Sequence, residues 1–307
     1  MRTYDVKNSM FSLLDFYIEN LEIREEIYKF IESKEEHGFY FSRLTILHFE
    51  MFNGSSNEII KAASAVEYLN LALDIIDDIQ DEDNAGNAWG SINKATLLNY
   101  AILLIFISQK ILIDIELMKK DAILRYFNEL TITAIQGQHL DLNMVCTNEE
   151  QYLEIIKKKS GALTSLAVVI GVLIAQDNYA LESIIEYATY IGISGQLLND
   201  ASDVIRLDDK SDVKNKKLTF PVLYLLNHPS QNLTIVKSYY NDEIGFGELI
   251  ENRELIIKEI LNSKAIEYTL IYKEIFVQKA LEIVKGIAFS NQKKKYEFID
   301  FLLGGGK

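Results

Sequence analysis

Proline occupies only two of the 307 positions, Pro221 and Pro229, so the backbone of this chain can form long helices almost without interruption. Apolar residues recur at helical spacing near the beginning of the chain and again after residue 96, at Phe11, Leu14, Tyr17, Ile18 and Leu21 and at Leu97, Leu98, Ala101, Ile102 and Ile105. No segment sustains the apolar and polar alternation of a strand. These patterns predict an all-α fold.

Breaks between the helical segments are few. The sequence predicts a helix-to-helix turn at 53–57, a longer loop at 84–90, and a polar, charged loop at 208–217 before Pro221. These breaks separate helices and not domains. We therefore predict a single domain that covers residues 1–307 and is large enough to bury a sizeable core.

The charge balance narrows the classes of partner. Forty-five acidic against 31 basic residues give a net charge of -14, which would repel a nucleic acid in the absence of a basic patch. A diphosphate would meet the same repulsion, so a site that binds one needs metal cations. The single cysteine, Cys146, excludes an internal disulfide framework, and four scattered histidines lack zinc-ligand spacing. We expect a reducing, cytoplasmic setting.

No segment reads as a membrane anchor. Residues 1–5 lack a charged-then-apolar signal pattern. The most apolar stretch, 162–175, contains polar residues and is shorter than the roughly 20 residues that span a bilayer. We interpret it as a buried core helix and expect no transmembrane segment; a position at the membrane periphery stays open.

A first cluster of carboxylates lies at the end of the apolar helical pattern 59–79. Asp74, Asp77, Asp78 and Asp81 are three or four residues apart, so they share one face of a helix and repel one another. Divalent cations would relieve that repulsion. A solvated acidic helix end is an equally good interpretation of this cluster alone.

A second cluster ends the helical pattern 181–205. Gln196, Asn199, Asp200 and Asp203 again share a helix face, and the preceding Gly192 and Gly195 allow another backbone to approach closely. Two facing oxygen-rich patches would suit Mg²⁺, which binds a few carboxylates together with phosphate oxygens and water. The pair of clusters therefore favours a metal site.

Basic residues that could contact a diphosphate stand near these clusters. They are Lys159, Arg206, Lys214, Lys216 and Lys217. Each alone is more often a surface residue, so their order along the chain carries the argument.

Five motifs in order make the chain resemble the trans-isoprenyl diphosphate synthase superfamily over nearly its whole length. They are Asp77-Asp78-Ile79-Gln80-Asp81, Gly137-Gln138-His139-Leu140-Asp141-Leu142, Lys159-Ser160-Gly161-Ala162-Leu163, the segment 196–203, and Lys217-Leu218-Thr219-Phe220-Pro221. The resemblance implies a helical bundle of the isoprenoid-synthase type with a central active-site cavity. It also implies a Mg²⁺-dependent prenyltransferase that commonly forms homodimers.

The same resemblance implies roles for single residues. Asp77, Asp81 and Asp200 would bind Mg²⁺ with support from Asp78 and Asp203, and Asn199 stands where the family carries a further aspartate. The expected contacts to the prenyl diphosphate are Gln138, Lys159, Gln196 and Lys217. Ala72 and Leu73, one turn before the first motif, would leave room for a prenyl tail of fifteen carbons.

The residues at the positions where the family forms a cationic pocket for a second diphosphate differ in this chain. Where the family has Gly-Lys-x-x-Arg, the segment 39–43 retains only Arg43 as a substrate contact. The expected histidine is Asn70, and the expected arginine pair aligns with Gly86 and Asn87. Each lost charge-assisted bond costs about 1.5–3 kcal/mol, so isopentenyl diphosphate should bind poorly.

The chain keeps the residues expected to bind the allylic diphosphate, the prenyl donor, and lacks most cations expected to bind isopentenyl diphosphate, the acceptor. In this combination it resembles the ComQ family. The local matches are 40–44, 47–52 and the second motif with its asparagine. This resemblance implies transfer of a geranyl or farnesyl group to a tryptophan of a ComX-type precursor peptide, a step in pheromone maturation for quorum sensing and competence.

Other interpretations stay open. A short-chain prenyl diphosphate synthase could use Arg43 and the lysines 293–295 for isopentenyl diphosphate. A terpene cyclase is disfavoured because Asp203 and Leu207 stand where its second motif has other residues. A non-catalytic synthase subunit or helical interaction module is disfavoured by the retained aspartates. We interpret His139 as a packing residue, Trp89 as a loop anchor, and Tyr40, Phe41 and Phe49 as core.

Overall fold

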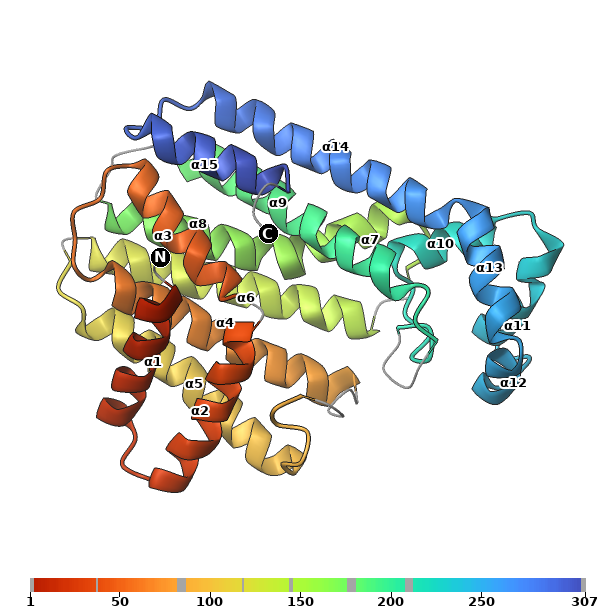
Figure 1. Cartoon of the computed structure of the whole chain (residues 1–307), viewed down its shortest axis with the longest axis horizontal. Coiled ribbons are helices and arrows are strands. Elements are labelled where there is room, and N and C mark those ends of the chain that lie inside the picture. The colour runs from red at the N-terminus through yellow and green to blue at the C-terminus, as the bar shows by residue number, and fades with distance from the viewer. Residues whose placement is uncertain are drawn as a thin grey trace. The chain divides into compact units, whose positions relative to one another are not determined.

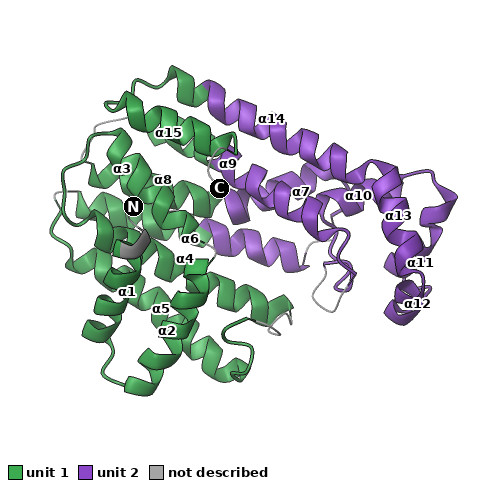
Figure 2. Cartoon of the chain, viewed as in Figure 1, with its two compact units in different colours: residues 1–132, 162–188, 283–307 green, residues 133–161, 189–282 purple. Residues whose placement is uncertain are grey.

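The protein is described by a computed structural model that covers residues 3–36, 38–81, 87–117, 119–143, 146–175, 181–207 and 212–304 (Figure 1). Every regular element within these ranges is a helix, which confirms the all-α prediction. The chain divides into two compact units, shown in Figure 2. Unit 1 comprises Met1–Ile132, Ala162–Ala188 and Ile283–Lys307, and unit 2 comprises Thr133–Gly161 and Thr189–Glu282. A single domain with a central cavity stays a prediction.

Among the described residues, seven helices lie wholly in unit 1: α1 Thr3–Tyr17, α2 Leu21–Glu36, α3 Tyr40–Met51, α4 Ile59–Asp81, α5 Lys94–Asp114, α8 Ala162–Ile174 and α15 Gln292–Leu302. Those wholly in unit 2 are α7 Glu149–Ile156, the π-helical segment η1 Lys157–Gly161, α10 Phe220–Asn227, the 3₁₀ turn η2 Gln231–Leu233, α11 Thr234–Tyr240, α12 Phe246–Glu251 and α13 Arg253–Ser263. Three helices have residues in both units: α6 Lys120–Asn143, α9 Leu181–Asp203 and α14 Ala265–Gly286.

The core of unit 1 is built around α4 and α8. Helix α4 packs against α5, and α3 packs against α8. A Cβ atom added to Gly171 of α8 would lie 2.1 Å from the carbonyl oxygen of Thr45, so only glycine permits this approach. The Thr45 hydroxyl donates a hydrogen bond of 2.9 Å to the Ala167 carbonyl across the same contact. The first carboxylate cluster therefore projects from a helix whose position is fixed by packing.

The apolar stretch 162–175 forms α8, and every residue of this helix except Leu163 is buried or nearly so. This confirms the prediction of a core helix. Helix α5, which was not expected to be a membrane span, is long and apolar enough to cross a membrane by length and composition. One side of α5 is buried within unit 1, where the helix packs on α4.

Helices α6 and α9 approach the π-helical segment η1 in unit 2. An added Cβ would lie 2.3 Å from the backbone nitrogen of Lys159 at Gly137, and 2.4 Å from the carbonyl oxygen of Ser160 at Gly192. The close approach expected at Gly192 is confirmed. The same expectation for Gly195 is wrong, because a Cβ there would meet nothing within 4 Å.

The expected breaks fall where helices end. The turn at 53–57 separates α3 from α4, and residues 212–217 precede α10, which carries Pro221 in its first turn. Residues 84–86 and 208–211 of the two longer loops lie outside the described residues. The acidic motifs lie on helices as expected, because α4 continues to Asp81 and α9 to Asp203.

Candidate active site

The first acidic motif forms the last two turns of α4 in unit 1. Asp78 accepts two hydrogen bonds at Oδ2, from the indole Nε1 of Trp89 at 2.8 Å and from Nδ2 of Asn87 at 2.5 Å. The Trp89 ring is 7% exposed and packs edge-on against Phe30, with 5.4 Å between ring centroids. The loop anchor expected at Trp89 is therefore also a direct partner of the motif.

One turn earlier on α4, Asp74 forms an ion pair with Lys34 of α2. The Asn70 side chain, which replaces the family's histidine, also contacts Asp74 Oδ2, at 3.4 Å. Burial alone would lower the pKa of Lys34, but the charges of Asp74 and Glu67 outweigh it and raise that pKa above its ordinary value. Lys34 therefore stays charged, and it was not among the predicted site residues.

Glu67 is fully buried beside the N-terminus of α3. Its Oε1 accepts a hydrogen bond of 2.8 Å from the backbone N–H of Ser42. Burial raises the pKa of Glu67, and the charge of Lys34 opposes that rise. A carboxylate therefore contacts the backbone at the segment where the family carries cationic residues.

The side chains at the start of α3 form an aromatic group. The guanidinium of Arg43 lies 5.3 Å from the centre of the Phe301 ring, and the Tyr40 ring is 5.8 Å from the same ring. The core assignment is confirmed for Phe49, which is 3% exposed, but it is wrong for Tyr40, which is 36% exposed. Phe41 is half-buried. The role of Arg43 toward substrate stays a prediction.

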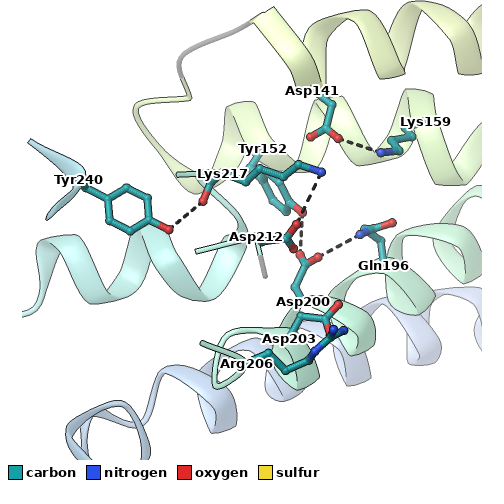
Figure 3. A network of polar contacts seen from close by, with 10 residues as sticks. All are labelled: Asp141, Tyr152, Lys159, Gln196, Asp200, Asp203, Arg206, Asp212, Lys217 and Tyr240. Atoms are coloured by element: carbon teal, nitrogen blue, oxygen red, sulfur yellow. Dashed lines mark hydrogen bonds and ion pairs between the residues drawn. The ribbon is translucent and has the colours of Figure 1, made fainter. Parts of the chain in front are cut away.

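The second acidic motif lies in unit 2, where Asp200 is central to a polar network (Figure 3). Its carboxylate accepts hydrogen bonds from the Tyr152 hydroxyl at 2.7 Å and from Nε2 of Gln196 at 3.0 Å. Asp200 is only 1% exposed, and burial raises its pKa to about 7 despite these two hydrogen bonds. No motif or spacing in the sequence pointed to Tyr152.

Other residues of this network bind the side chains that we predicted to contact the substrate (Figure 3). Lys159 forms an ion pair of 2.8 Å with Asp141, and the Ser160 hydroxyl donates to Oε1 of Gln196 at 2.8 Å. Both Lys159 and Ser160 belong to the π-helical segment η1, a rare conformation that is frequent at functional sites. Asp141 lies within the motif 137–142, so a role for it in the site could have been inferred from the sequence.

The lysines before α10 are engaged with unit 2. Lys217 lies 3.5 Å from an Asp212 carboxylate oxygen. Lys216 pairs with Asp242, and Lys214 lies 5.9 Å from the centre of the Phe246 ring.

The remaining predicted residues are more exposed to solvent than Asp200. Asp203 forms an ion pair of 3.1 Å with Arg206, and Asn199 is exposed. Gln138 is half-buried on α6. His139 is exposed beside Asn143, so its assignment as a packing residue is wrong.

The donor set fits Mg²⁺ in its chemistry. Asp77 and Asp81, four residues apart on α4, present carboxylate oxygens from one helix face. No three acidic, histidine or cysteine side chains within the described ranges are already grouped as a metal cage. Mg²⁺ commonly binds through one or two carboxylates and completes its shell with phosphate oxygens and water, so a cage of protein ligands is not required.

The sequence and the fold were compared with those of known proteins. The sequence pattern of the polyprenyl synthetase family matches residues 41–249. The protein named tryptophan prenyltransferase ComQ from Bacillus subtilis subsp. natto (strain BEST195) is 30% identical over 300 residues, which cover 97% of this chain and 92% of the relative. The protein of the same name from Bacillus subtilis (strain 168) is 31% identical, with 93% of this chain and 94% of the relative covered.

Solved structures share the fold. A decaprenyl diphosphate synthase from Rhodobacter capsulatus superposes with a TM-score of 0.81 at 18% identity, covering 98% of this chain and 94% of the other. A polyprenyl synthase from Caulobacter crescentus CB15, complexed with calcium and isoprenyl diphosphate, gives a TM-score of 0.78 at 20% identity, with coverages of 97% and 93%. The chain therefore belongs to the polyprenyl synthetase family and is a prenyltransferase.

Proposed function

We propose that this chain transfers a geranyl or farnesyl group from its diphosphate to a tryptophan of a ComX-type precursor peptide. Two relatives about 30% identical over nearly the whole chain carry the name tryptophan prenyltransferase. The modified peptide would serve as a quorum-sensing pheromone for competence. The enzyme would work in the cytoplasm, where its one cysteine, the buried and unbridged Cys146, needs no oxidising setting.

The observation that carries this proposal is the chemistry around the N-terminus of α3. A chain-elongating synthase needs cations there to hold a second diphosphate. In this chain the Glu67 carboxylate contacts the Ser42 amide, and the ammonium group of Lys34 is paired with Asp74. The pairing of Lys34 with Asp74 leaves this cation already neutralised, which disfavours a second anion and favours an acceptor without a diphosphate.

For the donor half we propose the residues that the two acidic motifs predict. Asp77, Asp81 and Asp200, with Asn199 and Asp203 nearby in sequence, would hold Mg²⁺, which would supply positive charge for the departing diphosphate. Trp89 and Asn87 hold Asp78 in place through its Oδ2. Lys159, Gln196, Lys217 and Gln138 would bind the diphosphate oxygens, and Arg43 would contact a substrate at the start of α3.

The prenyl tail would lie in a central cavity beside α4 that excludes water. Ala72 is fully buried and Leu73 half-buried on this helix, one turn before the first motif. Neither is bulky, which is compatible with a tail of fifteen carbons. Exclusion of water matters because hydrolysis would otherwise consume the allylic cation.

Product analysis tests the proposed function directly. Purified protein would be incubated with Mg²⁺, geranyl or farnesyl diphosphate, and either a tryptophan-containing precursor peptide or isopentenyl diphosphate. We expect a mass increase on the peptide of one prenyl group, none on a peptide with phenylalanine in place of tryptophan, and none after chelation of Mg²⁺. Chain-lengthened diphosphate as the sole product would reject the proposal in favour of a synthase.

The lysines near the C-terminus bear on that alternative. Lys295 is 9% exposed and donates hydrogen bonds of 3.0 Å to the carbonyls of Lys285 and Ile287. Lys294 forms ion pairs with Glu50 and Glu297. Both cations therefore have structural partners, which disfavours their use in an isopentenyl diphosphate pocket. A non-catalytic subunit would instead fail to bind a prenyl diphosphate analogue in the presence of Mg²⁺.

We also propose a homodimer formed through α5. Its outward face carries four exposed apolar side chains four to seven residues apart, namely Leu98, Ile102, Phe106 and Ile113. An apolar stripe of this kind favours burial against another surface. Replacing Phe106, which is 64% exposed, with Glu should convert a dimer to monomers in analytical ultracentrifugation. A wild-type protein that is monomeric at micromolar concentration would contradict the dimer.

A further inference from the structure

Three carboxylates on α4 act on the single ammonium group of Lys34. Asp74 binds it directly, and the charges of Glu67 and Asp78 also act on it. These three residues lie seven and four positions apart, which places them along one face of the helix. Lys34 comes from α2, so a second helix supplies the cation.

One carboxylate in this group has an oxygen without a partner. Glu67 uses Oε1 to accept the Ser42 amide, whereas its Oε2 is buried and has no hydrogen-bond partner among the residues that the structure describes. The residue is 0% exposed. A buried acceptor of this kind favours a nearby ligand that donates hydrogen bonds.

The exposed member of the group is Asp74. Its side chain is 40% exposed, whereas that of Lys34 is 18% exposed. The ammonium group of Lys34 and the amide of Asn70 both contact Oδ2, so the orientation of the carboxylate is fixed from the side of the protein. Asp74 is therefore a pre-oriented acceptor one turn before the first acidic motif.

The charges select the class of ligand. The positive charge of Lys34 is already paired with the carboxylate of Asp74, which disfavours an anion and favours a neutral group with an N–H. One turn further along the same face of α4, a carboxylate already accepts a hydrogen bond from a neutral N–H group. The indole Nε1 of Trp89 donates to Asp78 at 2.8 Å.

We propose that Asp74 is the catalytic carboxylate on the acceptor side, which accepts the N–H of the substrate indole and takes up its proton during transfer. Lys34 is the positioning residue for this carboxylate. The inference rests on the proposed function, since it requires a tryptophan acceptor. The acidic motifs would bind the Mg²⁺ and diphosphate of the prenyl donor, whereas Asp74 would receive the proton of the acceptor.

The proposed step balances without another reagent. The C–O bond of the prenyl diphosphate breaks, and its electron pair leaves with the diphosphate. The π electron pair at C3 of the indole ring forms the new C–C bond, which leaves an iminium charge on the ring nitrogen. The N–H bond then breaks, its electrons stay on nitrogen as a lone pair beside a neutral C=N bond, and the proton passes to the carboxylate of Asp74 and later to solvent.

The deciding experiment measures how the allylic group is partitioned. Wild type and Asp74→Asn would be incubated with Mg²⁺, farnesyl diphosphate and the peptide, and the prenylated peptide and the prenyl alcohol quantified separately. We expect the variant to form at least 100-fold less peptide product and to retain alcohol release within about threefold. Peptide product within threefold of wild type overturns the role of Asp74, as does an equal loss of both products.

The outcome for wild type keeps the two proposals distinguishable. Absence of peptide product with wild type rejects the proposed function, whatever Asp74 does. A wild type that prenylates the peptide, together with a fully active Asp74→Asn, leaves the proposed function intact and removes only this inference.

A modified acceptor provides a test that does not depend on folding of the variant. A peptide with 1-methyltryptophan lacks the N–H, so wild-type enzyme should release alcohol and form at least tenfold less peptide product. Undiminished prenylation of this peptide contradicts the inference.

Matched variants separate catalysis from structure. Lys34→Met should lower the peptide product without lowering alcohol release, and Lys34→Arg should restore it. Glu35→Gln removes a comparable ion pair from α2, because Lys7 and Glu35 are 2.8 Å apart with side-chain exposures of 20% and 34%. We expect Glu35→Gln to leave both products unchanged; a change in partition equal to that of Lys34→Met would assign the effect to α2 stability and overturn the inference.

Discussion

The indole N–H of Trp89 donates a hydrogen bond of 2.8 Å to Oδ2 of Asp78, in the middle of the first acidic motif. The sequence contains no other tryptophan. Intrinsic tryptophan fluorescence therefore reports on the immediate surroundings of this motif.

The first prediction concerns this hydrogen bond. Trp89→Phe keeps an aromatic ring against Phe30 and removes the donor to Asp78. Because a hydrogen bond to a charged group contributes about 1.5–3 kcal/mol, we expect the rate of prenyl transfer to fall about 10- to 100-fold and the melting temperature to fall by a few degrees. Trp89→Ala should also lower the melting temperature. An active Trp89→Phe would show that Asn87 holds Asp78 sufficiently by itself.

Fluorescence supplies an independent measurement with wild-type protein. Addition of Mg²⁺ together with a non-hydrolysable prenyl diphosphate analogue should change the emission of Trp89, and Asp77→Asn should abolish the change. An unchanged spectrum with proven binding of the analogue would argue that the first motif does not contact the ligand.

The second prediction concerns the glycines that face η1. Gly137→Ala and Gly192→Ala would place a methyl group within 2.3 Å and 2.4 Å of backbone atoms of this segment. Overpacking of this kind costs about 1–3 kcal/mol, and it should also displace Lys159 and lower activity. Thermal unfolding and prenyl transfer rates would measure the two effects.

Gly195→Ala is the matched control on the same helix as Gly192. Its Cβ meets nothing within 4 Å, so the substitution should stabilise α9 by about 0.5–1 kcal/mol. Equal destabilisation by all three substitutions would mean that contact with η1 is not the cause.

The positions of the acidic motifs could be predicted from the sequence because their signal is local. Apolar residues at helical spacing continue into both clusters, and i, i+3 and i+4 spacing then places the carboxylates on one face. The core helix at 162–175 was equally predictable, because its buried residues are consecutive and apolar.

The partners of these carboxylates could not be predicted in the same way. Lys34 is 40 residues from Asp74, and Tyr152 is 48 residues from Asp200. Such contacts depend on how helices pack, and no periodicity in one sequence records which polar residues meet. The π-helical segment η1 has no sequence pattern of its own either, although Lys159 within it was identified through a family motif.

The third prediction concerns Lys295 of α15, whose side chain reaches the C-terminal end of α14. Its ammonium group satisfies the carbonyls of Lys285 and Ile287 at a helix C-terminus, where backbone acceptors lack intrahelical partners. Lys295→Met should lower the free energy of unfolding by about 2 kcal/mol without changing the identity of the product. Lys293→Met, at an exposed neighbouring position, should change neither. A switch in product with Lys295→Met would instead support its role in substrate binding.

The fourth prediction is a pH dependence of stability that arises from His48. This side chain is 0% exposed, its Nδ1 donates to the Leu44 carbonyl at 2.7 Å, and its ring packs edge-on against Phe298. Burial lowers the pKa of His48 from 6.5 to about 4, despite the hydrogen bond to the Leu44 carbonyl. Between these values the unfolded chain binds the proton and the folded chain does not. The contribution of His48 to stability is therefore complete above pH 6.5 and is lost as the pH falls toward 4.

Urea unfolding at pH 7 and pH 5 measures this effect. The shift in pKa corresponds to a loss of about 2 kcal/mol between these two pH values. His48→Asn keeps a side-chain donor for the Leu44 carbonyl and cannot titrate, so the difference in free energy of unfolding between pH 7 and pH 5 should shrink by that amount. The absolute stability of the variant is not the relevant quantity, because the smaller side chain leaves a cavity at both pH values. If wild type and His48→Asn lose the same free energy between pH 7 and pH 5, other groups are responsible for the acid sensitivity and His48 does not titrate on unfolding.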